Sequence, residues 1–284
     1  MIKFTKMHGA GNDYVYVDLF KESISNPVEL AIEVSPRHHS IGSDGLITIG
    51  PSDKSGAVAK MTIYNADGSK AQMCGNGIRC VAKYVYDEGY TNKAEFDLDT
   101  DSGIKTVRVK LGDDGKVDQV TVDMGVLSLD PKVLPCTIAG ESVIDYPIST
   151  ENGEFVMNFT CVSVGNPHAV TFVDDVNTCP LEKAGPLYEN HKVFPERINV
   201  EFCHVISRSE VDMRVWERGS AETYACGTGG AATTYACIVN GLTDDRVLMH
   251  LKGGDLVYEF DRSTGHMMMT GPATRVFDGV FYEN

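Results

Sequence analysis

The sequence is poor in positive charge. Its 284 residues carry 25 Lys and Arg against 40 Asp and Glu, which gives a formal net charge of −15. A surface with this balance repels polyanions at long range, which argues against a nucleic acid or an anionic membrane as the partner. A small acid is a different case, because it needs only a local group of donors.

The sequence also lacks the segments that direct a protein to a membrane. Its N-terminus, Met1 to His8, has no apolar h-region and is typical of a strand, so we expect no secretory signal. The uncharged stretch between Glu222 and Asp244 is close to the roughly 20 residues of a membrane-spanning helix. It contains four glycines and five threonines, which favour a buried helix of a soluble protein instead.

The eight cysteines show neither the spacing of a small disulfide-rich domain nor the CxxC pairs of a zinc site. We therefore expect free thiols, no bound metal and a cytoplasmic protein. Cys136, Cys161, Cys179 and Cys203 lie in or beside strand-like segments, where a free thiol is usually a small core residue.

The sequence does contain one motif that occurs twice. The segments QMCGNGIRC, around Cys74, and ACGTGG, around Cys226, each place a cysteine before a glycine turn that opens an apolar run. We call each of them a cysteine corner. A glycine suited to ending a helix follows each cysteine by fifteen residues. Two further pairs of segments keep the same order, GNDYVYVD with GNPHAVTFVDD and VTVDMG with MMMTG.

This repetition predicts two copies of one domain. We place the first copy at residues 1–121, completed by the C-terminal segment 273–284, and the second at residues 122–272. The alternating segments 105–111, 118–124 and 255–260 are typical of half-buried strands, with a hairpin turn at GDDGK.

Helices are expected in only a few places. One begins at Pro27 and is limited by Pro36, and one follows each of the two corner cysteines. The helix after Cys226 has no polar face, which predicts burial on every side. The predicted fold class is therefore α+β with mostly antiparallel sheet.

A thiol at the start of a helix is well placed for proton transfer. The free N–H groups and the peptide dipoles there stabilise a thiolate, so we expect a thiol pKa below the usual value of about 8.5. The same amides can bind a carboxylate, and the glycines allow a ligand to approach the backbone closely. Two such corners facing one carbon would supply the base and the acid that inversion at that carbon requires.

The motifs quoted above, together with FPERINVEF and ERGSAE, closely resemble those of the diaminopimelate epimerase family from Lys3 to about Asp278. The resemblance implies cofactor-independent interconversion of LL- and meso-diaminopimelate, within lysine and peptidoglycan precursor synthesis. It also implies two pseudo-symmetric domains, each a curved, mostly antiparallel sheet around a central helix, with the site in the cleft between them.

The resemblance assigns roles to residues motif by motif. The two catalytic acid/base thiols would be Cys74 and Cys226. The cradle for the reacting carboxylate would be formed by Gly75, Asn76, Gly227 and Thr228. The residues that hold the substrate, mostly at its distal end, would be Asn12, Asn65, Asn166, Asn199, Glu217 and Arg218.

Two positions depart from the family pattern. Gly45 stands where some members carry a glutamine, so one substrate contact is expected to be missing, and Thr228 stands where serine is common. The role of His168, in GNPH, stays open, because it could orient an acid of the site or be a structural histidine.

Other functions also stay open at this point. The chain could be another isomerase of the same fold, such as a proline-racemase-like enzyme. The eight cysteines also allow a thiol-redox or metal-binding module, and the carboxylate cradle allows an amino-acid-binding protein without catalysis. The expected partner is a small-molecule substrate. Homodimers are common in the family, but no interface signature in the sequence predicts one.

Overall fold

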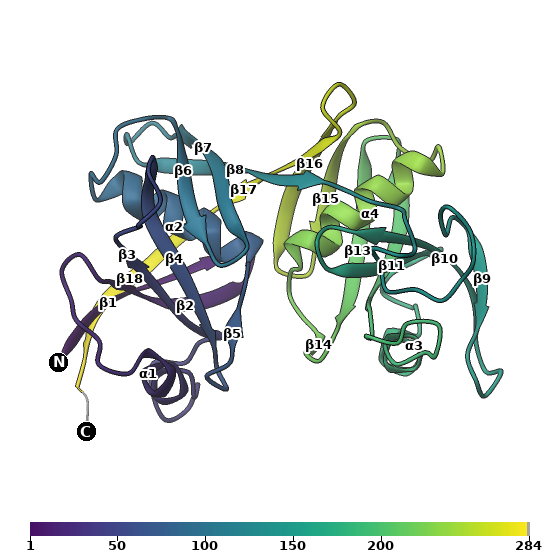
Figure 1. Ribbon diagram of the computed structural model, residues 1–284, viewed down its shortest axis with the longest axis horizontal. Helices are drawn as coiled ribbons and strands as arrows, with labels where there is room; N and C mark the ends of the chain where they lie inside the picture. The colour runs from purple at the N-terminus through teal and green to yellow at the C-terminus, as the bar shows by residue number, and fades with distance from the viewer. Residues whose placement is uncertain (283–284) are drawn as a thin grey trace. The chain divides into compact units, whose positions relative to one another are not determined.

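The computed structural model describes residues 1–282 and shows an α+β protein with many short strands and few helices (Figure 1). The predicted fold class is confirmed. The chain divides into two compact units, Met1–Asp123 with the C-terminal segment from Thr270, and Met124–Met269. The domain boundaries after residues 121 and 272 stay a prediction, because compactness does not show that either part folds alone.

The first unit surrounds one central helix with strands (Figure 1). Its helices are α1 (Pro27–Val34) and α2 (Gly75–Asp87). Its strands are β1 (Ile2–Gly9), β2 (Asn12–Asp18), β3 (Gly45–Gly50), β4 (Ala57–Asn65), β5 (Lys70–Ala71), β6 (Glu95–Thr100), β7 (Gly103–Leu111), β8 (Val117–Val126) and β18 (Thr274–Phe281). Helix α2 packs against β1, β2, β4 and β7, so most of its residues are buried.

The strand order of the first unit follows from its helices. The pairs β1–β2, β3–β4, β6–β7 and β7–β8 are antiparallel. The pairs β2–β3 and β4–β6 are parallel, because α1 and α2 carry the chain back to the starting edge before the next strand begins. The C-terminal strand β18 pairs antiparallel with β1.

The second unit repeats this order around its own central helix. Its helices are α3 (Leu181–Glu189) and α4 (Gly227–Val239). Its strands are β9 (Tyr146–Ser149), β10 (Val156–Ser163), β11 (Pro167–Phe172), β12 (Asn199–Ser207), β13 (Glu210–Glu217), β14 (Ala221–Glu222), β15 (Arg246–Leu251), β16 (Gly254–Asp261) and β17 (His266–Pro272). Here β10–β11 and β12–β13 are antiparallel, and β11–β12 and β13–β15 are parallel.

Local sequence signals explain where three of the helices begin and end. Asn26 caps α1 by accepting a hydrogen bond from the Glu29 N–H at 3.2 Å, and Pro27 fills the first helical position. Helices α2 and α4 are both 13 residues long. Each is followed by a glycine in the left-handed region, Gly89 with φ 81° and Gly241 with φ 72°. The predicted helices after the two corner cysteines are confirmed.

Helix α3 was not predicted, because its sequence is unfavourable for a helix. Gly185 and Pro186 lie inside it, and both residue types weaken helices. Packing makes up for this, since Leu181 and Tyr188 are buried in the core of the second unit. A Cβ at Gly185 would lie 2.7 Å from the Trp216 ring, so the glycine lets α3 approach β13 closely.

The helix without a polar face, α4, is an internal helix of the second unit. It packs against β10, β11, β12, β13 and β16, and residues such as Ala231, Ala232 and Cys237 are fully buried. This confirms the prediction of burial on every side. Within residues 1–282, no helix combines the length and the apolar character needed to cross a bilayer.

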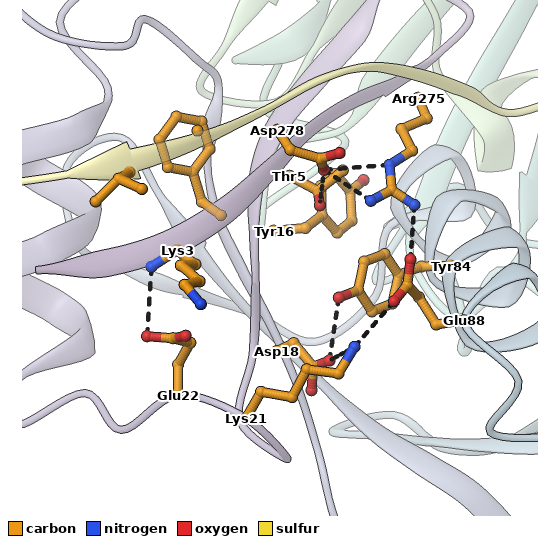
Figure 2. Close-up of a pocket in the computed structure, with 13 residues that line it drawn as sticks. Lys3, Thr5, Tyr16, Asp18, Lys21, Glu22, Tyr84, Glu88, Arg275 and Asp278 are labelled. Atoms are coloured by element: carbon orange, nitrogen blue, oxygen red, sulfur yellow. Dashed lines mark hydrogen bonds and ion pairs between the residues drawn. The ribbon is translucent and has the colours of Figure 1, made fainter.

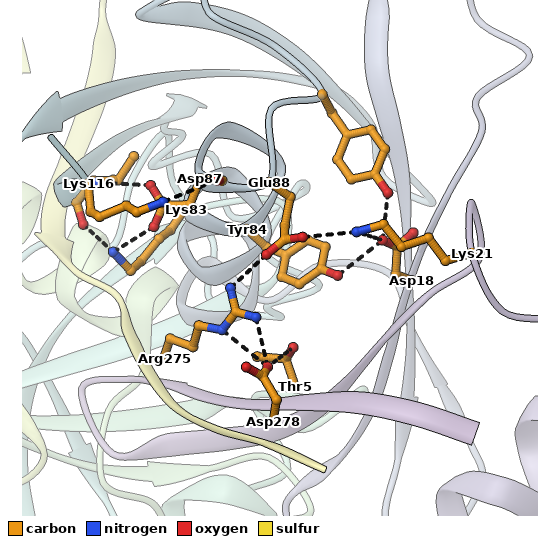
Figure 3. Close-up of polar contacts among 12 residues, drawn as sticks. Thr5, Asp18, Lys21, Lys83, Tyr84, Asp87, Glu88, Lys116, Arg275 and Asp278 are labelled. Carbon is orange, nitrogen blue, oxygen red and sulfur yellow. Dashed lines mark hydrogen bonds and ion pairs between the residues drawn. The ribbon is translucent and has the colours of Figure 1, made fainter. Parts of the chain in front are cut away.

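Ion pairs fasten the C-terminal end of α2 to other segments of the first unit (Figure 3). Glu88, the residue that follows α2, accepts hydrogen bonds from Lys21 Nζ at 2.9 Å and from Arg275 Nη1 at 2.8 Å. Arg275 also donates to Asp278 on β18 at 2.8 Å. The helix is thereby fixed at one end, and its other end carries Cys74.

On the second unit, His250 lies between two carboxylates. Its Nε2 is 2.8 Å from Glu210 Oε1, and its Nδ1 is 2.8 Å from Asp255 Oδ1. These hydrogen bonds to Glu210 and Asp255 raise the pKa of His250 above its ordinary value of 6.5. A group with a raised folded pKa stabilises the fold fully below its unfolded pKa, and this contribution is lost as the pH rises through the folded pKa.

We therefore expect a pH-dependent share of stability from His250. Urea unfolding should give the wild type a larger free energy of unfolding than His250→Gln at about pH 6. This difference in free energy should shrink as the pH rises above about 6.5. A difference that stayed constant over this range would show that the charge on His250 is not the cause.

Candidate active site

The first cysteine corner lies at the N-terminus of α2. Cys74 is the N-cap residue and has an extended backbone, with φ −142° and ψ 112°. The Gly77 N–H donates to Cys74 Sγ at 3.3 Å. The thiol in turn donates to Asn12 Oδ1 at 3.2 Å. A helix amide and a predicted substrate residue therefore both contact this sulfur.

Asn12 is held by a chain of polar contacts on the same unit. Its Nδ2 donates to Asp44 Oδ2 at 2.7 Å, and Asp44 is paired with Arg37 at 2.8 Å. Because the amide nitrogen is engaged by the carboxylate, the amide oxygen is left facing Cys74. Asp44 was not identified from the sequence, although it stands in the GSDG segment next to Gly45.

The other predicted residues of the first unit lie around this corner. Gly75 and Asn76 form the first turn of α2 and are buried. A Cβ at Gly9 would lie 2.9 Å from Asn76 O, so the end of β1 packs directly on this turn. Asn65 ends β4, and its Nδ2 donates to Ser69 Oγ at 3.0 Å.

The departure at Gly45 has a local structural reason. Gly45 begins β3 and is the partner of Asn65 in the β3–β4 pair. A Cβ at Gly45 would lie 2.1 Å from Tyr64 O, which no side chain can accommodate without moving the strand. The glycine is therefore required by this backbone.

The second cysteine corner repeats the geometry of the first. Cys226 is the N-cap of α4, with φ −111° and ψ 108°, and the Gly229 N–H donates to its Sγ at 3.3 Å. The Thr228 Oγ1 lies 3.5 Å from the same sulfur. Gly227 O accepts a hydrogen bond from Tyr258 OH at 2.9 Å, which holds the first turn of α4 against β16.

The GNPH segment adjoins this second corner. Asn166 Nδ2 donates to Thr228 Oγ1 at 3.2 Å, and Asn166 Oδ1 lies 3.1 Å from His168 Nε2. His168 is fully buried at the start of β11. The structure thus places His168 in contact with a predicted substrate residue.

The remaining predicted residues of the second unit gather at the end of β13. Glu217 is half-buried and accepts a hydrogen bond from the Thr223 hydroxyl. Asn199 Oδ1 accepts from the Arg218 N–H at 2.8 Å. The Arg218 side chain is exposed and donates to Glu196 O at 3.2 Å, so Asn199 fixes the backbone from which this guanidinium extends.

Burial changes the acid strength of the second thiol. Burial raises the pKa of Cys226 well above its usual range, and the charges of Glu217 and Glu201 raise it further. The hydrogen bonds from Thr228 and from the Gly229 N–H lower it. The expectation of a lowered pKa is therefore wrong for Cys226, because desolvation outweighs the helix amides.

Burial also raises the pKa of Glu217, although hydrogen bonds with Thr223 and Cys226 lower it in part. A carboxyl group with a raised pKa beside a thiol is typical of a functional site. Glu217 therefore belongs to the surroundings of Cys226 as well as to the predicted substrate residues.

One residue of this site was missed from the sequence. Glu201 lies in β12, is fully buried, and its Oε1 is 2.6 Å from His168 Nδ1. A signal was available, because Glu201 is a carboxylate within the apolar segment from Val200 to Val205. A buried charge of this kind needs a partner.

A pocket of about 370 Å³ also lies on the first unit, lined by side chains of β1, β2, α2 and β18 (Figure 2). Several of its charged groups pair with each other, as Lys21 does with Glu88 and Arg275 with Asp278. It adjoins the C-terminal end of α2, and a helix of this length places that end about 20 Å from Cys74. The pocket therefore lies towards the opposite end of α2 from the N-terminal turn that Cys74 caps.

The cysteine and acidic side chains offer no obvious metal ligand set. Over residues 1–282, no group of three or more His, Cys, Asp or Glu side chains is arranged to hold a metal ion. All eight cysteines are free thiols. In the second unit, the sulfurs of Cys203 and Cys237 lie 3.7 Å apart in the core.

Comparison with known proteins identifies close relatives. A family model described as diaminopimelate epimerase matches residues 4–129 and 160–276. The diaminopimelate epimerase of Agathobacter rectalis is 59% identical, covering 98% of this chain and 98% of the relative. The diaminopimelate epimerase of Methanococcus maripaludis is 49% identical, covering 98% of this chain and 99% of the relative.

Solved structures with lower sequence identity share the fold. A probable proline racemase from Agrobacterium radiobacter superposes with a TM-score of 0.71 at 14% identity, covering 100% of this chain and 94% of the other. A hydroxyproline epimerase from Agrobacterium vitis gives a TM-score of 0.69 at 16% identity, covering 98% and 90%. At such identities the likeness concerns the fold alone.

Proposed function

The chain belongs to the diaminopimelate epimerase family, and from this membership we propose both its reaction and the residues that perform it. It interconverts LL- and meso-2,6-diaminopimelate by inverting one α carbon, within lysine and peptidoglycan precursor synthesis. The observation that supports the choice of residues is the repeated corner. Cys74 and Cys226 cap helices of equal length with the same N–H to sulfur contact.

Inversion at a carbon needs one group that removes a proton and another that delivers one to the opposite face. In the proposed reaction, Cys74 and Cys226 act on opposite faces of the α carbon of one substrate. A thiolate takes the α hydrogen as a proton, and the electrons of the C–H bond pass into the adjacent carboxylate. The opposite thiol then gives its proton to the other face and becomes the thiolate for the reverse reaction. The raised pKa of Cys226 suits it to start as the acid.

The first turns of α2 and α4 stabilise the charge that develops on the carboxylate. Gly75, Asn76, Gly227 and Thr228 contribute backbone N–H groups at helix N-termini, where the peptide dipoles favour an anion. A well-placed donor of this kind lowers a barrier by about 3 kcal/mol. Because the dipoles are fixed by the helices, no reorganisation is needed during the reaction.

The distal end of the substrate carries a second ammonium and a second carboxylate. Arg218, exposed and anchored through Asn199, can bind that carboxylate in bidentate fashion. Glu217, at the adjacent position, can pair with an ammonium group. This polar set favours diaminopimelate over a substrate with one amino-acid end, such as proline.

Exchange of the α hydrogen with solvent tests this proposal. LL-diaminopimelate incubated with the protein in D2O should form meso-diaminopimelate that carries deuterium at the inverted carbon. The loss of the α-hydrogen signal is measured by proton NMR. The deuterium enters because the acid thiol has exchanged its proton with the solvent. Meso product that kept its original hydrogen would contradict the two-base mechanism.

The same measurement separates two of the alternatives, and oxidation of the thiols tests the third. An amino-acid-binding protein would bind diaminopimelate without exchange, and a proline-racemase-like enzyme would exchange the α hydrogen of proline in a parallel sample. A redox module would gain activity when its thiols are oxidised, whereas an acid/base pair of thiols loses activity. We also propose that the protein acts in the cytoplasm and assembles as a homodimer. The eight free thiols support the location, because thiols stay reduced in that compartment.

A further inference from the structure

A chain of hydrogen bonds leads from the core of the second unit to Cys226. Glu201 Oε1 lies 2.6 Å from His168 Nδ1, and His168 Nε2 lies 3.1 Å from Asn166 Oδ1. Asn166 Nδ2 then donates to Thr228 Oγ1 at 3.2 Å, and Thr228 Oγ1 lies 3.5 Å from Cys226 Sγ. The chain joins β12, β11 and the first turn of α4.

The inner end of this chain is costly for the fold. Glu201 and His168 are both 0% exposed, and within residues 1–282 Glu201 Oε2 has no hydrogen-bond partner. A Cβ at Gly229 would lie 2.9 Å from Glu201 Oε1, so the carboxyl group lies directly under the first turn of α4. A buried carboxyl group with one unpaired oxygen destabilises a protein, which suggests that its role is functional.

Each link of the chain fixes the direction of the next. Because His168 Nε2 faces an amide oxygen, it must donate its hydrogen to Asn166 Oδ1. The contact between His168 Nδ1 and Glu201 Oε1 then contains one further proton, which lies between these two atoms. Asn166 is thereby held with its NH2 group towards Thr228. Thr228 Oγ1 accepts that hydrogen bond, so its own hydrogen is free to point at Cys226 Sγ.

We propose that Glu201 is a positioning residue which, through His168 and Asn166, sets the direction in which the Thr228 hydroxyl donates its hydrogen bond to Cys226. The donated bond stabilises the thiolate that forms when Cys226 gives up its proton. The inference rests on the proposed function only in giving Cys226 an acid/base role.

A simple charge effect of Glu201 would act in the opposite direction. The groups that face Cys226 are Glu217 on β13, Glu201 on β12 with its partner His168 on β11, and Thr228 and Gly229 on α4. A negative charge at Glu201 disfavours the thiolate, so removing that charge alone would make Cys226 more acidic. Breaking the hydrogen-bond chain would make it less acidic. The sign of the effect therefore distinguishes the two roles.

The test is the rate at which iodoacetamide alkylates Cys226 at about pH 8, followed by mass spectrometry of the peptide that contains it, because only the thiolate reacts. Thr228→Val removes the hydroxyl at constant shape, and Glu201→Met breaks the chain at its inner end. Each should slow alkylation about tenfold, the effect of losing one charge-assisted hydrogen bond. The double variant should be no slower than either single variant, because both act through one link.

Two further variants serve as controls. Glu201→Gln removes the charge but keeps a hydrogen-bond donor opposite His168 Nδ1, so its alkylation should be at least as fast as in the wild type. Thr234→Val makes the same change on α4 at a buried hydroxyl that has no partner within residues 1–282, so it should leave the rate unchanged. If Glu201→Met fails to fold, Asn166→Leu breaks the chain at a partly exposed position and should slow alkylation equally.

Faster alkylation in Glu201→Met would overturn the proposal, because loss of charge or a loosened corner would then be the dominant effect. An unchanged rate, or rates that add in the double variant, would overturn it as well. Alkylation does not require turnover, so a failure of deuterium exchange with the expected alkylation rates would refute the epimerase mechanism and leave the hydrogen-bond chain intact.

Discussion

Replacing Cys74 or Cys226 by alanine should reduce the epimerisation of LL-diaminopimelate about 10³-fold or more, because each variant lacks a positioned acid or base. The helices themselves should survive, since the cap contact from Gly77 or Gly229 to sulfur is one weak hydrogen bond at 3.3 Å. Turnover is measured by following the two stereoisomers, and folding by circular dichroism. The two variants should be equally impaired, because inversion needs both faces.

The matched control is Cys136→Ser. Cys136 is a half-buried thiol of the second unit, outside both corners, and its variant should keep wild-type turnover. If either corner variant turned over at the wild-type rate, the thiol in question would not be a proton carrier. If Cys136→Ser were also inactive, loss of any thiol would disturb the protein, and the corner variants would prove nothing specific.

Gly230→Ala should destabilise the second unit by about 2–3 kcal/mol, a cost typical of an overpacked core. A Cβ at Gly230 would lie 2.3 Å from Tyr258 OH and 2.5 Å from its Cζ. Tyr258 is fully buried on β16, so its ring cannot turn away into solvent. Its hydroxyl holds Gly227 O in the first turn of α4, so turnover should fall as well. Urea unfolding and the epimerase assay measure the two effects.

A second substitution tests whether this collision is the cause. Tyr258→Leu alone leaves a cavity and should be destabilising. Combined with Gly230→Ala, it removes the ring that the new methyl group meets, so the double variant should be more stable than the sum of the two single effects predicts. Strictly additive effects would show that Gly230 and Tyr258 do not share this contact.

The parts of the site that were predictable from the sequence are those that depend on local backbone. A cysteine that precedes a glycine turn and an apolar run predicts the N-cap of each helix. Gly89 and Gly241 predict where the two helices end. The equal spacing of these signals in the two halves predicted the repeated corner. The helix beginning at Pro27 followed from the same kind of local rule.

The parts that were not predictable depend on contacts between distant segments. The pKa of Cys226 is set by burial under several strands, and no local pattern reports how deeply a thiol will lie. Helix α3 exists because Gly185 admits the Trp216 ring, a contact between residues far apart in the chain. The role proposed for Glu201 depends on its hydrogen bond with His168, which lies on the parallel neighbouring strand β11.

The pairing of β18 with β1 has a consequence for biosynthesis. Strand β1 pairs with β18, which is synthesised only after the whole second unit. The second unit, by contrast, is continuous in sequence and is complete before translation ends. The first unit therefore stays incomplete until the second unit has been made, and its open edge at β1 has to be kept from wrong partners during that time.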